Sequence, residues 1–248
     1  MRPLWILLIP VIMGSCQPSG TRPLIIGHRG AMGHVTENTT ASVEKALEIG
    51  VDMIEIDVFR IRSGEIIVFH DDRVDRLTDG SGPVEAFDFE GLFALNLEGG
   101  HKIPTLEQIL QVMQHRVPLN IELKGAGTAT GVHAIVREYC RTGGWQPDQF
   151  VISSFDWDEL RAYRGLDAGA RIAVLTDENP LEAIDTAREL GAEAINPANR
   201  QMDKATAAAL HDAGFQINVW TVNSRSRFDS LQRMGVDGVF TNYPDRMH

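Results

Sequence analysis

The chain has 248 residues, of which 43% are hydrophobic, and its formal net charge at pH 7 is −11. This length and apolar content suit one large α/β domain at least as well as two small ones. The negative charge argues against nucleic acid or an anionic membrane surface as a general partner, because both require basic patches. An anionic substrate would therefore need a local positive site.

The N-terminal segment has the composition of an export signal. Arg2 precedes ten apolar residues, from Leu4 to Met13, and two small residues then lead to Cys16. Ten apolar residues are too few to span a bilayer, but they fit the apolar region of an export signal. A short polar stretch follows Cys16 and precedes the first strand-like run.

Because the signal-like stretch ends at a cysteine, residues 1–15 resemble a bacterial lipoprotein signal, although Met13 stands where Leu, Val or Ile is usual. Residues 16–22 are then a polar tether. We expect an exported protein of the bacterial cell envelope or periplasm, anchored to the membrane through lipidated Cys16. Plain secretion and a buried N-terminal strand or helix are the alternatives. Cys140 would be the remaining thiol, so no internal disulfide is expected.

Short apolar runs alternate with helical patterns along the rest of the chain. Eight candidate strands lie at 23–27, 52–58, 118–124, 150–154, 171–175, 193–196, 216–220 and 238–241. Helical patterns that end in glycine lie at 40–50, 180–191 and 203–214. Because alternating strands and helices need right-handed crossovers around a parallel sheet, residues 23–248 are predicted to form a (β/α)8 TIM barrel.

Two irregularities could shape the mouth of this barrel. Residues 71–104 form an insertion after the second strand. Only residues 242–248 follow the eighth strand, so the closing helix should be short or missing. The loops that follow the strands build the active sites of such barrels.

Acidic residues interrupt two of the buried strands. Along a strand, side chains alternate between faces, so Glu55 and Asp57 share one face while their apolar neighbours share the other. Glu122 holds the matching position near the end of the third barrel strand. Three carboxylates would then converge at the rim, where Ca²⁺ or Mg²⁺ would find the oxygen ligands that it prefers. A rim salt bridge is the alternative for any one of them.

A hairpin is predicted to bring His70 to the same place. Ser63 and Gly64 form a turn dipeptide between two strand-like runs. With a two-residue loop, Asp57 would pair with His70, and directly opposed side chains have Cβ atoms about 5 Å apart. A three-residue loop would shift this pairing by one residue.

His28 ends the first strand directly before Arg29, so both residues should lie at the rim beside the second strand. A histidine flanked by glycines can also serve turn geometry. Asn38 or Thr39 is expected to cap the first helix, and Glu37 would then be a first-turn acid or a partner for Arg29.

The ordered motifs "GHRG", "TENT", "GVDMIEIDV", "EIIVFHDDRVDRLTDGSG", "IPTLEQIL", "LNIELKG", "VWTVN" and "GVDGVFTNYPD" resemble those of the glycerophosphodiester phosphodiesterase family from about residue 24 to 245. The resemblance implies a metal-dependent hydrolysis of glycerophosphodiesters to glycerol 3-phosphate and an alcohol. It implies one divalent cation, Ca²⁺ or Mg²⁺, held by Glu55, Asp57 and Glu122. It also implies His28 and His70 as the acid/base pair, Arg29 and Lys124 as phosphate contacts, and Trp220 as an aromatic residue near the pocket.

Two other functions fit the same motifs. A phospholipase D-type enzyme acting on lysolipids would use an apolar rim, and residues 83–104 contain Phe87, Phe89, Leu92 and Phe93. These side chains could equally pack the insertion onto the barrel. A lipoprotein that binds phosphodiesters without turnover is the other alternative, and the intact histidine pair argues against it.

Overall fold

The computed structural model describes residues 22–248. The predicted signal at residues 1–15 and the predicted anchor Cys16 therefore lie outside the described residues. Within the described part, no helix combines the length and the apolar character that crossing a bilayer requires. Cys140 is a free, half-buried thiol.

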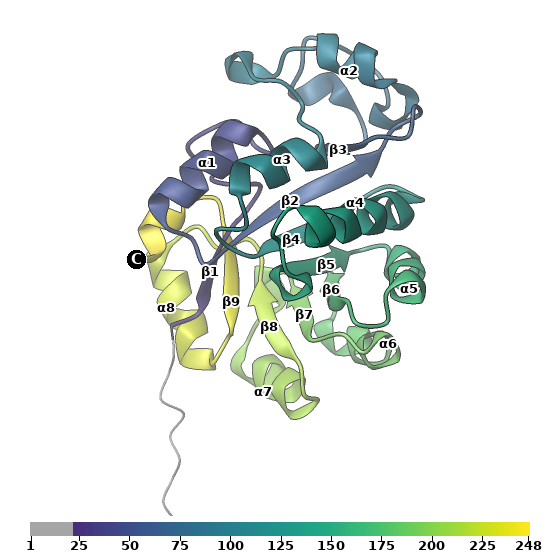
Figure 1. Ribbon diagram of the computed structural model, residues 1–248. Coiled ribbons are helices and arrows are strands. Elements are labelled where there is room, and N and C mark those ends of the chain that lie inside the picture. The colour runs from purple at the N-terminus through teal and green to yellow at the C-terminus, as the bar shows by residue number, and fades with distance from the viewer. Residues whose placement is uncertain (1–21) are drawn as a thin grey trace, which may run out of the picture.

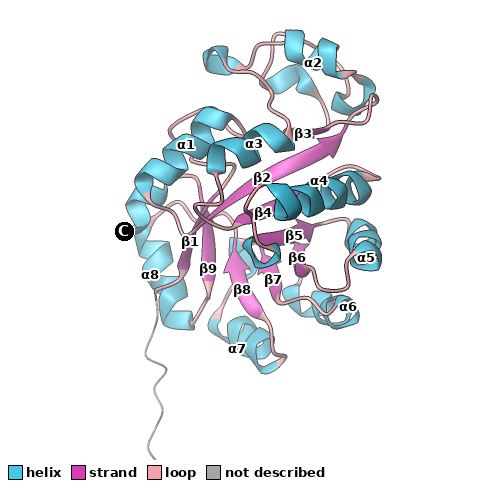
Figure 2. Cartoon of the chain, in the orientation of Figure 1, coloured by secondary structure: helices cyan, strands magenta, loops and turns pink. Residues whose placement is uncertain are grey.

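Eight parallel strands close into a barrel, and helices surround it on the outside (Figures 1 and 2). Neighbours follow the chain order around the sheet, and the first strand closes the circle by pairing with both the second and the last. One additional strand, β3 (Ile66–Val68), pairs antiparallel with the outer end of β2 (Met53–Arg60) and forms a hairpin with it. The predicted (β/α)8 architecture is confirmed.

The strands and helices follow the expected order along the chain. The strands are β1 Leu24–Gly27, β2 Met53–Arg60, β3 Ile66–Val68, β4 Leu119–Leu123, β5 Phe150–Ser154, β6 Arg171–Thr176, β7 Ala194–Pro197, β8 Gln216–Val219 and β9 Gly238–Thr241. The helices are α1 Thr40–Ile49, α2 Phe89–Ala94, α3 Leu106–Met113, α4 Thr128–Thr142, α5 Trp157–Leu166, α6 Ile184–Leu190, α7 Lys204–Asp212 and α8 Arg225–Met234.

The alternation of side chains along each strand divides the core into two parts. Outward-facing residues such as Ile54, Ile56 and Ile121 pack against the surrounding helices in the main apolar cluster. A small apolar cluster fills the barrel interior, formed by Ile26, Met53, Val151, Ala173, Ala194 and Phe240. Polar residues near the strand ends lie above this interior plug, so the barrel is closed beneath the site.

The hairpin of β2 and β3 forms, but its predicted register is wrong by one residue. Val58 pairs with Val68, and the backbone N–H of Phe69 donates to the carbonyl of Asp57 at 3.0 Å. Asp57 therefore lies opposite Phe69 and not His70. The loop holds three residues, with Gly64 at a φ of 107°, a conformation that glycine adopts at little cost.

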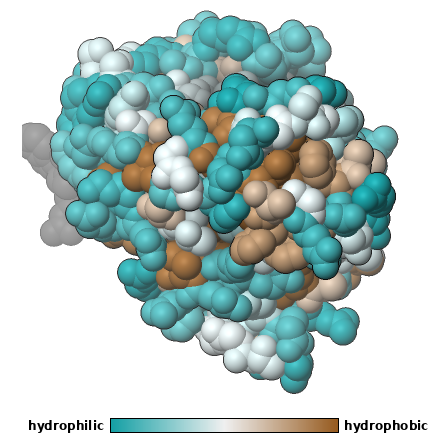
Figure 3. Space-filling model, turned by 90° about the horizontal axis from the view of Figure 1, so that it is seen from above, coloured by the Kyte–Doolittle hydropathy of each residue, from teal (hydrophilic) through white to brown (hydrophobic). Residues whose placement is uncertain are grey.

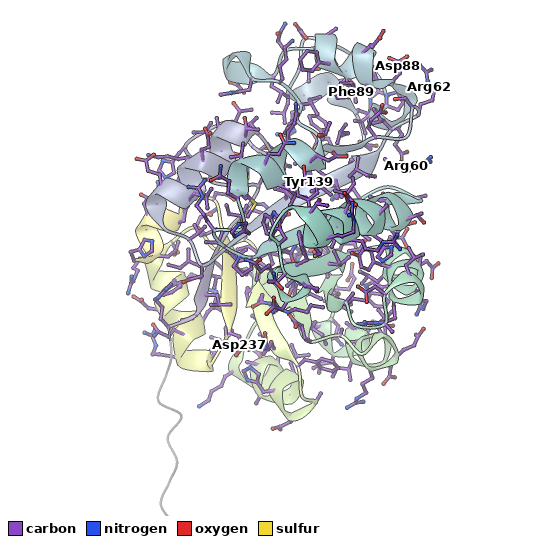
Figure 4. All side chains as sticks on the ribbon, viewed as in Figure 1. Arg60, Arg62, Asp88, Phe89, Tyr139 and Asp237 are labelled. Atoms are coloured by element: carbon purple, nitrogen blue, oxygen red, sulfur yellow. The ribbon has the colours of Figure 1, made fainter. Side chains whose placement is uncertain are left out.

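The insertion between β3 and α3 packs against the outer end of the β2–β3 hairpin in a second apolar core. Its buried members are Phe59, Ile61, Ile67, Phe69, Val74, Leu77, Val84, Leu92, Leu97 and Ile103. Figure 1 shows this segment standing outside the ring of helices, beyond the far end of β2. An ion pair of 3.0 Å joins Arg62 in the hairpin loop to Asp88 at the start of α2, next to Phe89 (Figure 4).

The aromatic residues of the insertion mostly serve this core. Phe87, Phe89 and Leu92 pack into it, as the packing alternative predicts, whereas Phe93 is 49% exposed. In the view from above, hydrophobic residues gather across the middle of the face and hydrophilic residues surround them (Figure 3).

The barrel closes at its C-terminal end without an eighth long helix. A short 3₁₀ turn, Pro244–Met247, follows β9, as the seven-residue tail predicts. Met247 is fully buried in the main apolar cluster, and Arg225 of α8 donates to its carbonyl at 3.0 Å. The turn therefore covers the gap that a helix would otherwise fill.

A distant carboxylate caps the helix that follows β4. Gly127 at the N-cap of α4 has no side chain to satisfy the first backbone N–H groups. Glu159 of α5 accepts from the N–H of Gly127 at 2.6 Å and from that of Ala129 at 2.9 Å. A carboxylate at this position also interacts favourably with the helix dipole. The contact fixes the loop that carries Lys124.

We expect Glu159→Ala to lower the free energy of unfolding by about 1–3 kcal/mol, because it leaves the buried N–H of Ala129 and the partly buried N–H of Gly127 without an acceptor. Urea denaturation of the purified protein measures this change. Asp158→Ala on the same helix, where the side chain is 89% exposed, is the matched control and should change stability by about 0.5 kcal/mol or less. Equal losses in the two variants would contradict the capping role.

Candidate active site

Three carboxylates meet inside the mouth of the barrel. Glu55 and Asp57 extend from β2, and Glu122 extends from the adjacent strand β4, where it pairs in register with Asp57. One oxygen from each of the three lies within 4.8 Å of the others. All three residues are buried or nearly so, with Asp57 only 1% exposed. The sequence prediction that they converge is confirmed.

Burial and mutual repulsion set the ionisation of this cluster. Burial, followed by the charges of Asp57 and Glu122, raises the pKa of Glu55 well above its usual value. Burial and the charge of Asp57 raise the pKa of Glu122 to about 7. Burial would also raise the pKa of Asp57, but Arg29, His70 and Lys124 outweigh it and lower that pKa overall. Asp57 is therefore the anionic centre of the cluster.

Arg29 forms one side of the site, directly after β1. Its backbone N–H donates to Glu55 Oε2 at 2.9 Å, and its guanidinium lies 3.3 Å from Asp57 Oδ2 and 2.7 Å from Glu37 Oε1. Its φ of 52° is a left-handed conformation that few non-glycine residues adopt. Burial would lower the pKa of Arg29, but the surrounding carboxylates raise it overall, so the side chain is a fixed cation.

Asn38 holds Asp57 through two hydrogen bonds. Its amide donates to Asp57 Oδ2 at 2.9 Å, and its carbonyl oxygen accepts from the backbone N–H of Asp57 at 3.3 Å. Thr39 caps α1, which answers the question of which residue is the cap. Asn38, at a φ of 56°, instead turns its side chain into the site.

Lys124 forms the opposite side of the site, one residue beyond β4. Its ammonium lies 2.8 Å from Glu122 and 3.9 Å from Asp57, and 5.9 Å from the centre of the Phe155 ring. Burial would lower the pKa of Lys124, but Glu122 and Asp57 raise it overall. Two cations of different geometry thus flank the carboxylates.

His28 is buried beside the carboxylates. Its Nδ1 bonds to Asn242 Oδ1 at 2.7 Å, so Nδ1 carries the proton, and its Nε2 lies 4.0 Å from Glu55 Oε2. Burial, together with the charge of Arg29, lowers the pKa of His28 to about 4. The imidazole is therefore neutral near pH 7, and its Nε2 is free to accept a proton.

His70 lies one residue after the last backbone pair of the hairpin. Its Nδ1 bonds to Asp71 Oδ1 at 2.6 Å, and a carboxylate there requires the proton on Nδ1. Burial would raise the pKa of Asp71, but hydrogen bonds from Arg76 and His70 outweigh it and bring that pKa to about 2. His70 lines the same cleft as His28 and Glu55 despite the shifted register.

A single cleft is lined by His28, Arg29, Glu55, His70, Asn120, Glu122, Ser153, Phe155, Leu175, Trp220 and Phe240. Its far wall is apolar. Trp220 lies edge-on to Phe155 at 5.3 Å between ring centres, and its indole N–H donates to the carbonyl of Asn196 at 2.9 Å. The structure thus brings all eight predicted site residues to one place, with Asp57 and Lys124 directly behind the charged side.

Residues 28–246 match the sequence model of the glycerophosphoryl diester phosphodiesterase family. The chain belongs to this family. A glycerophosphodiester phosphodiesterase of Bacillus altitudinis is 31% identical over 90% of this chain and 95% of the relative. Another, from Caldanaerobacter subterraneus, is 28% identical over 91% and 96%. The family identifies the chain as an enzyme, a phosphoric diester hydrolase.

Solved structures of similar proteins agree with the family. A phosphodiesterase of Oleispira antarctica, in complex with the product sn-glycerol-3-phosphate, has a TM-score of 0.84 and 28% identity, covering 91% of this chain and 95% of its own. A glycerophosphodiester phosphodiesterase of Agrobacterium tumefaciens has a TM-score of 0.79 and 26% identity, with coverage of 91% and 98%.

Several residues of the site were not predicted from the sequence. Asn242 orients His28, Asn38 holds Asp57, and Asp71 orients His70. The available signal was their position, since each lies within one of the motifs that carry the family resemblance. Glu37 was predicted as a partner of Arg29, and the structure confirms that contact.

In chelator, we expect Glu122→Gln to become more stable than the wild type as the pH rises from about 5 to 7.5. The unfolded Glu122 ionises near its usual pKa of 4.5, whereas the folded residue holds its proton up to a pKa of about 7. The folded state therefore binds more protons in this window and loses stability as the pH rises, on the order of 2 kcal/mol.

The neutral glutamine removes this loss. Comparing thermal unfolding of the two proteins at each pH cancels the opposite contribution of His28, whose lowered pKa makes the folded state gain stability between about pH 4 and 6.5. A difference in stability that stays constant over this range would contradict the raised pKa of Glu122.

Proposed function

We propose that the enzyme hydrolyses glycerophosphodiesters to glycerol 3-phosphate and an alcohol. The reaction would use one divalent cation, Ca²⁺ or Mg²⁺, held by Glu55, Asp57 and Glu122. The observation that carries the proposal is this buried cluster of carboxylates beside two histidines and two cationic side chains. Glycerol 3-phosphate bound as the product of the Oleispira antarctica phosphodiesterase supports the substrate class.

The carboxylate cluster fits a hard cation. Glu55 Oε1 is buried and has no hydrogen-bond partner among the described residues, and burial followed by the charge of Asp57 raises the pKa values of Glu55 and Glu122. A divalent cation would satisfy this oxygen and neutralise the repulsion, and oxygen ligands of this kind suit Ca²⁺ and Mg²⁺. When bound, such a cation supplies charge neutralisation to the phosphodiester.

The chain's own residues would bind and orient the phosphodiester. Arg29 and Lys124 stand on opposite sides of the carboxylates, where a planar fork and a point charge can contact different phosphoryl oxygens. Both are already fixed by ion pairs, so their positive charge is in place before the substrate arrives. The apolar wall with Trp220 would pack against the carbon atoms of the glycerol group.

Proton transfer is proposed for the two histidines. Asn242 fixes the Nδ1 proton of His28 and Asp71 fixes that of His70, so in each ring Nε2 is the atom available for exchange. One ring would take a proton from the attacking hydroxyl, and the other would give one to the leaving alkoxide. The two atoms act on opposite ends of the same reaction, which matches the placement of both rings on one cleft.

Turnover of glycerophosphocholine should cease in excess chelator and return when Ca²⁺ or Mg²⁺ is added. Asp57→Asn and His70→Asn should then fail differently. Asp57→Asn removes charge from the carboxylate cluster, so raising the metal concentration should recover part of its rate. His70→Asn should lose about 10²- to 10⁴-fold in kcat at any metal concentration, because it cannot exchange a proton. Steady-state kinetics over a metal titration separate the two.

A substrate with a nitrophenolate leaving group assigns the two proton-transfer roles, because such a group needs little protonation. Rescue of His70→Asn makes His70 the acid, and rescue of His28→Asn reverses the roles. Full activity of the wild type in excess chelator would refute the metal dependence. Full recovery of His70→Asn by added metal would refute its proposed chemistry.

We further propose that the protein is exported and anchored through lipidated Cys16, which lies outside the described residues. The signal-like composition of residues 1–15 supports this proposal. Cys16→Ala should release the protein from the membrane fraction or leave it unprocessed in fractionated cells, whereas Cys140→Ala should remain in the membrane fraction. A processed Cys16→Ala protein that stays tightly bound to the membrane would exclude a lipid anchor.

A further inference from the structure

Arg76 connects the insertion to the active site through two carboxylates. It ends the 3₁₀ turn Val74–Arg76, and its guanidinium lies between Asp71 and Glu37. Its Nε and Nη2 donate to the two oxygens of Asp71 at 2.5 and 3.0 Å. Its Nη1 and Nη2 donate to the two oxygens of Glu37 at 3.1 and 2.8 Å. One planar group therefore holds both carboxylates in bidentate contacts.

Each of these carboxylates holds one residue of the site. Asp71 Oδ1 bonds to His70 Nδ1 at 2.6 Å, and Glu37 Oε1 accepts from Arg29 Nη1 at 2.7 Å. Arg76 itself is absent from the residues that line the cleft. Arg76 lines a neighbouring cavity with His70 and Lys124. It reaches the cleft of His28 and Glu55 through its two partners.

The barrel alone does not fix His70. β3 ends at Val68, and the last backbone contact with β2 is the bond from Phe69 to Asp57. His70 thus lies beyond the sheet, and its ring is oriented by Asp71. The turn that carries Arg76 is in turn held by the insertion, because Val74 is fully buried in its core and bonds through its N–H to the carbonyl of Gly82.

Without Arg76, the two carboxylates would repel each other. Ligand atoms of Glu37, His70 and Asp71 lie within 4.8 Å of one another. The positive charge of Arg76 keeps this arrangement together, and the hydrogen bonds that Arg76 donates to Asp71 and Glu37 raise its pKa. Removing the guanidinium would separate Asp71 from Glu37 and move His70 and Arg29 in different directions.

We propose that Arg76 is a positioning residue for catalysis, which sets the orientation of His70 through Asp71 and that of Arg29 through Glu37. This inference rests on the proposed function, because it assumes that both residues act on the phosphodiester. The insertion then contributes to the reaction through one side chain, although its core lies outside the barrel. A misplacement of about 1 Å at a reacting group can cost about 10²-fold in rate.

Arg73 is the matched control. It lies three residues before Arg76, its side chain is 50% exposed against 49% for Arg76, and it pairs with Asp75 at 3.2 Å. Its guanidinium donates to Asp75, which makes no hydrogen bond to His70 or Arg29. Arg73→Ala should therefore leave kcat within about twofold of the wild type.

Arg76→Ala should lower kcat about 10- to 100-fold with KM changed by threefold or less, because the orientation of groups in the cleft is altered and the cleft lining is kept. Arg76→Lys should restore only part of the rate, since a single ammonium cannot hold both carboxylates in bidentate contacts. Added guanidinium at low millimolar concentration should raise the rate of Arg76→Ala and leave that of Arg73→Ala unchanged. A purely structural defect would not respond to guanidinium.

A double variant tests whether Arg76 acts through Asp71. Arg76→Ala should cost clearly less in the Asp71→Asn background than in the wild type, because the path to His70 is already broken. Fully additive losses would overturn the path through Asp71. A kcat for Arg76→Ala equal to that of Arg73→Ala would overturn the proposal as a whole.

A spectroscopic measurement keeps this test separate from the proposed function. The full chain has eight histidines, which suits assignment of ring nitrogens by ¹H–¹⁵N NMR. At a pH where His70 is neutral, the wild type and Arg73→Ala should show the proton on Nδ1, and Arg76→Ala should show a mixture of tautomers. An unchanged tautomer in Arg76→Ala would contradict the positioning role. Full turnover by His70→Asn would instead refute the proposed function. The tautomer of His70 in Arg76→Ala would still show whether Arg76 orients the ring.

Discussion

The crowding of three carboxylates inside the barrel mouth is the constraint to which the rest of the site responds. Buried acids this close repel one another, and burial alone disfavours the ionised form of each. Burial would raise the pKa of Asp57, but the neighbouring positive charges lower it overall. Burial and the charge of Asp57 raise the pKa values of Glu55 and Glu122, so one residue is anionic and two keep their protons to higher pH. The repulsion within the cluster therefore lowers the stability of the fold, and the proposed cation would remove this cost by neutralising the charge.

The surrounding residues keep this costly cluster in a defined shape. Asn38, in the loop before α1, holds Asp57 from one side. Arg29, two residues after β1, contacts two of the acids, and Lys124, one residue after β4, contacts the third. The ends of two barrel strands therefore set the relative positions of the two cations. Rigidity below the site, supplied by the apolar interior, allows the charged groups above it to be held in fixed positions.

Features that depend on local periodicity were predicted correctly from the sequence. Features that depend on the length and conformation of a loop were not. The shared face of Glu55 and Asp57 follows from the period of two along a strand, and the closed barrel follows from the order of elements. The pairing of His70 failed because a Ser-Gly dipeptide fits loops of two or three residues, and the backbone of Gly64 selects the longer one. The bond between His28 and Asn242 joins residues 214 positions apart, so no local pattern could indicate it.

The separate apolar core of the insertion has a consequence for dynamics. Because this core joins the insertion only to the outer end of the β2–β3 hairpin and shares no members with the main cluster around the barrel, we expect the insertion to open more readily than the barrel. Such an opening would release the turn that ends at Arg76 and, with it, the orientation of His70. The population of active enzyme would then follow the local stability of about thirty residues outside the barrel rather than the global stability of the protein. Amide hydrogen exchange in the insertion, compared with that of the barrel strands, is the natural measure of this difference.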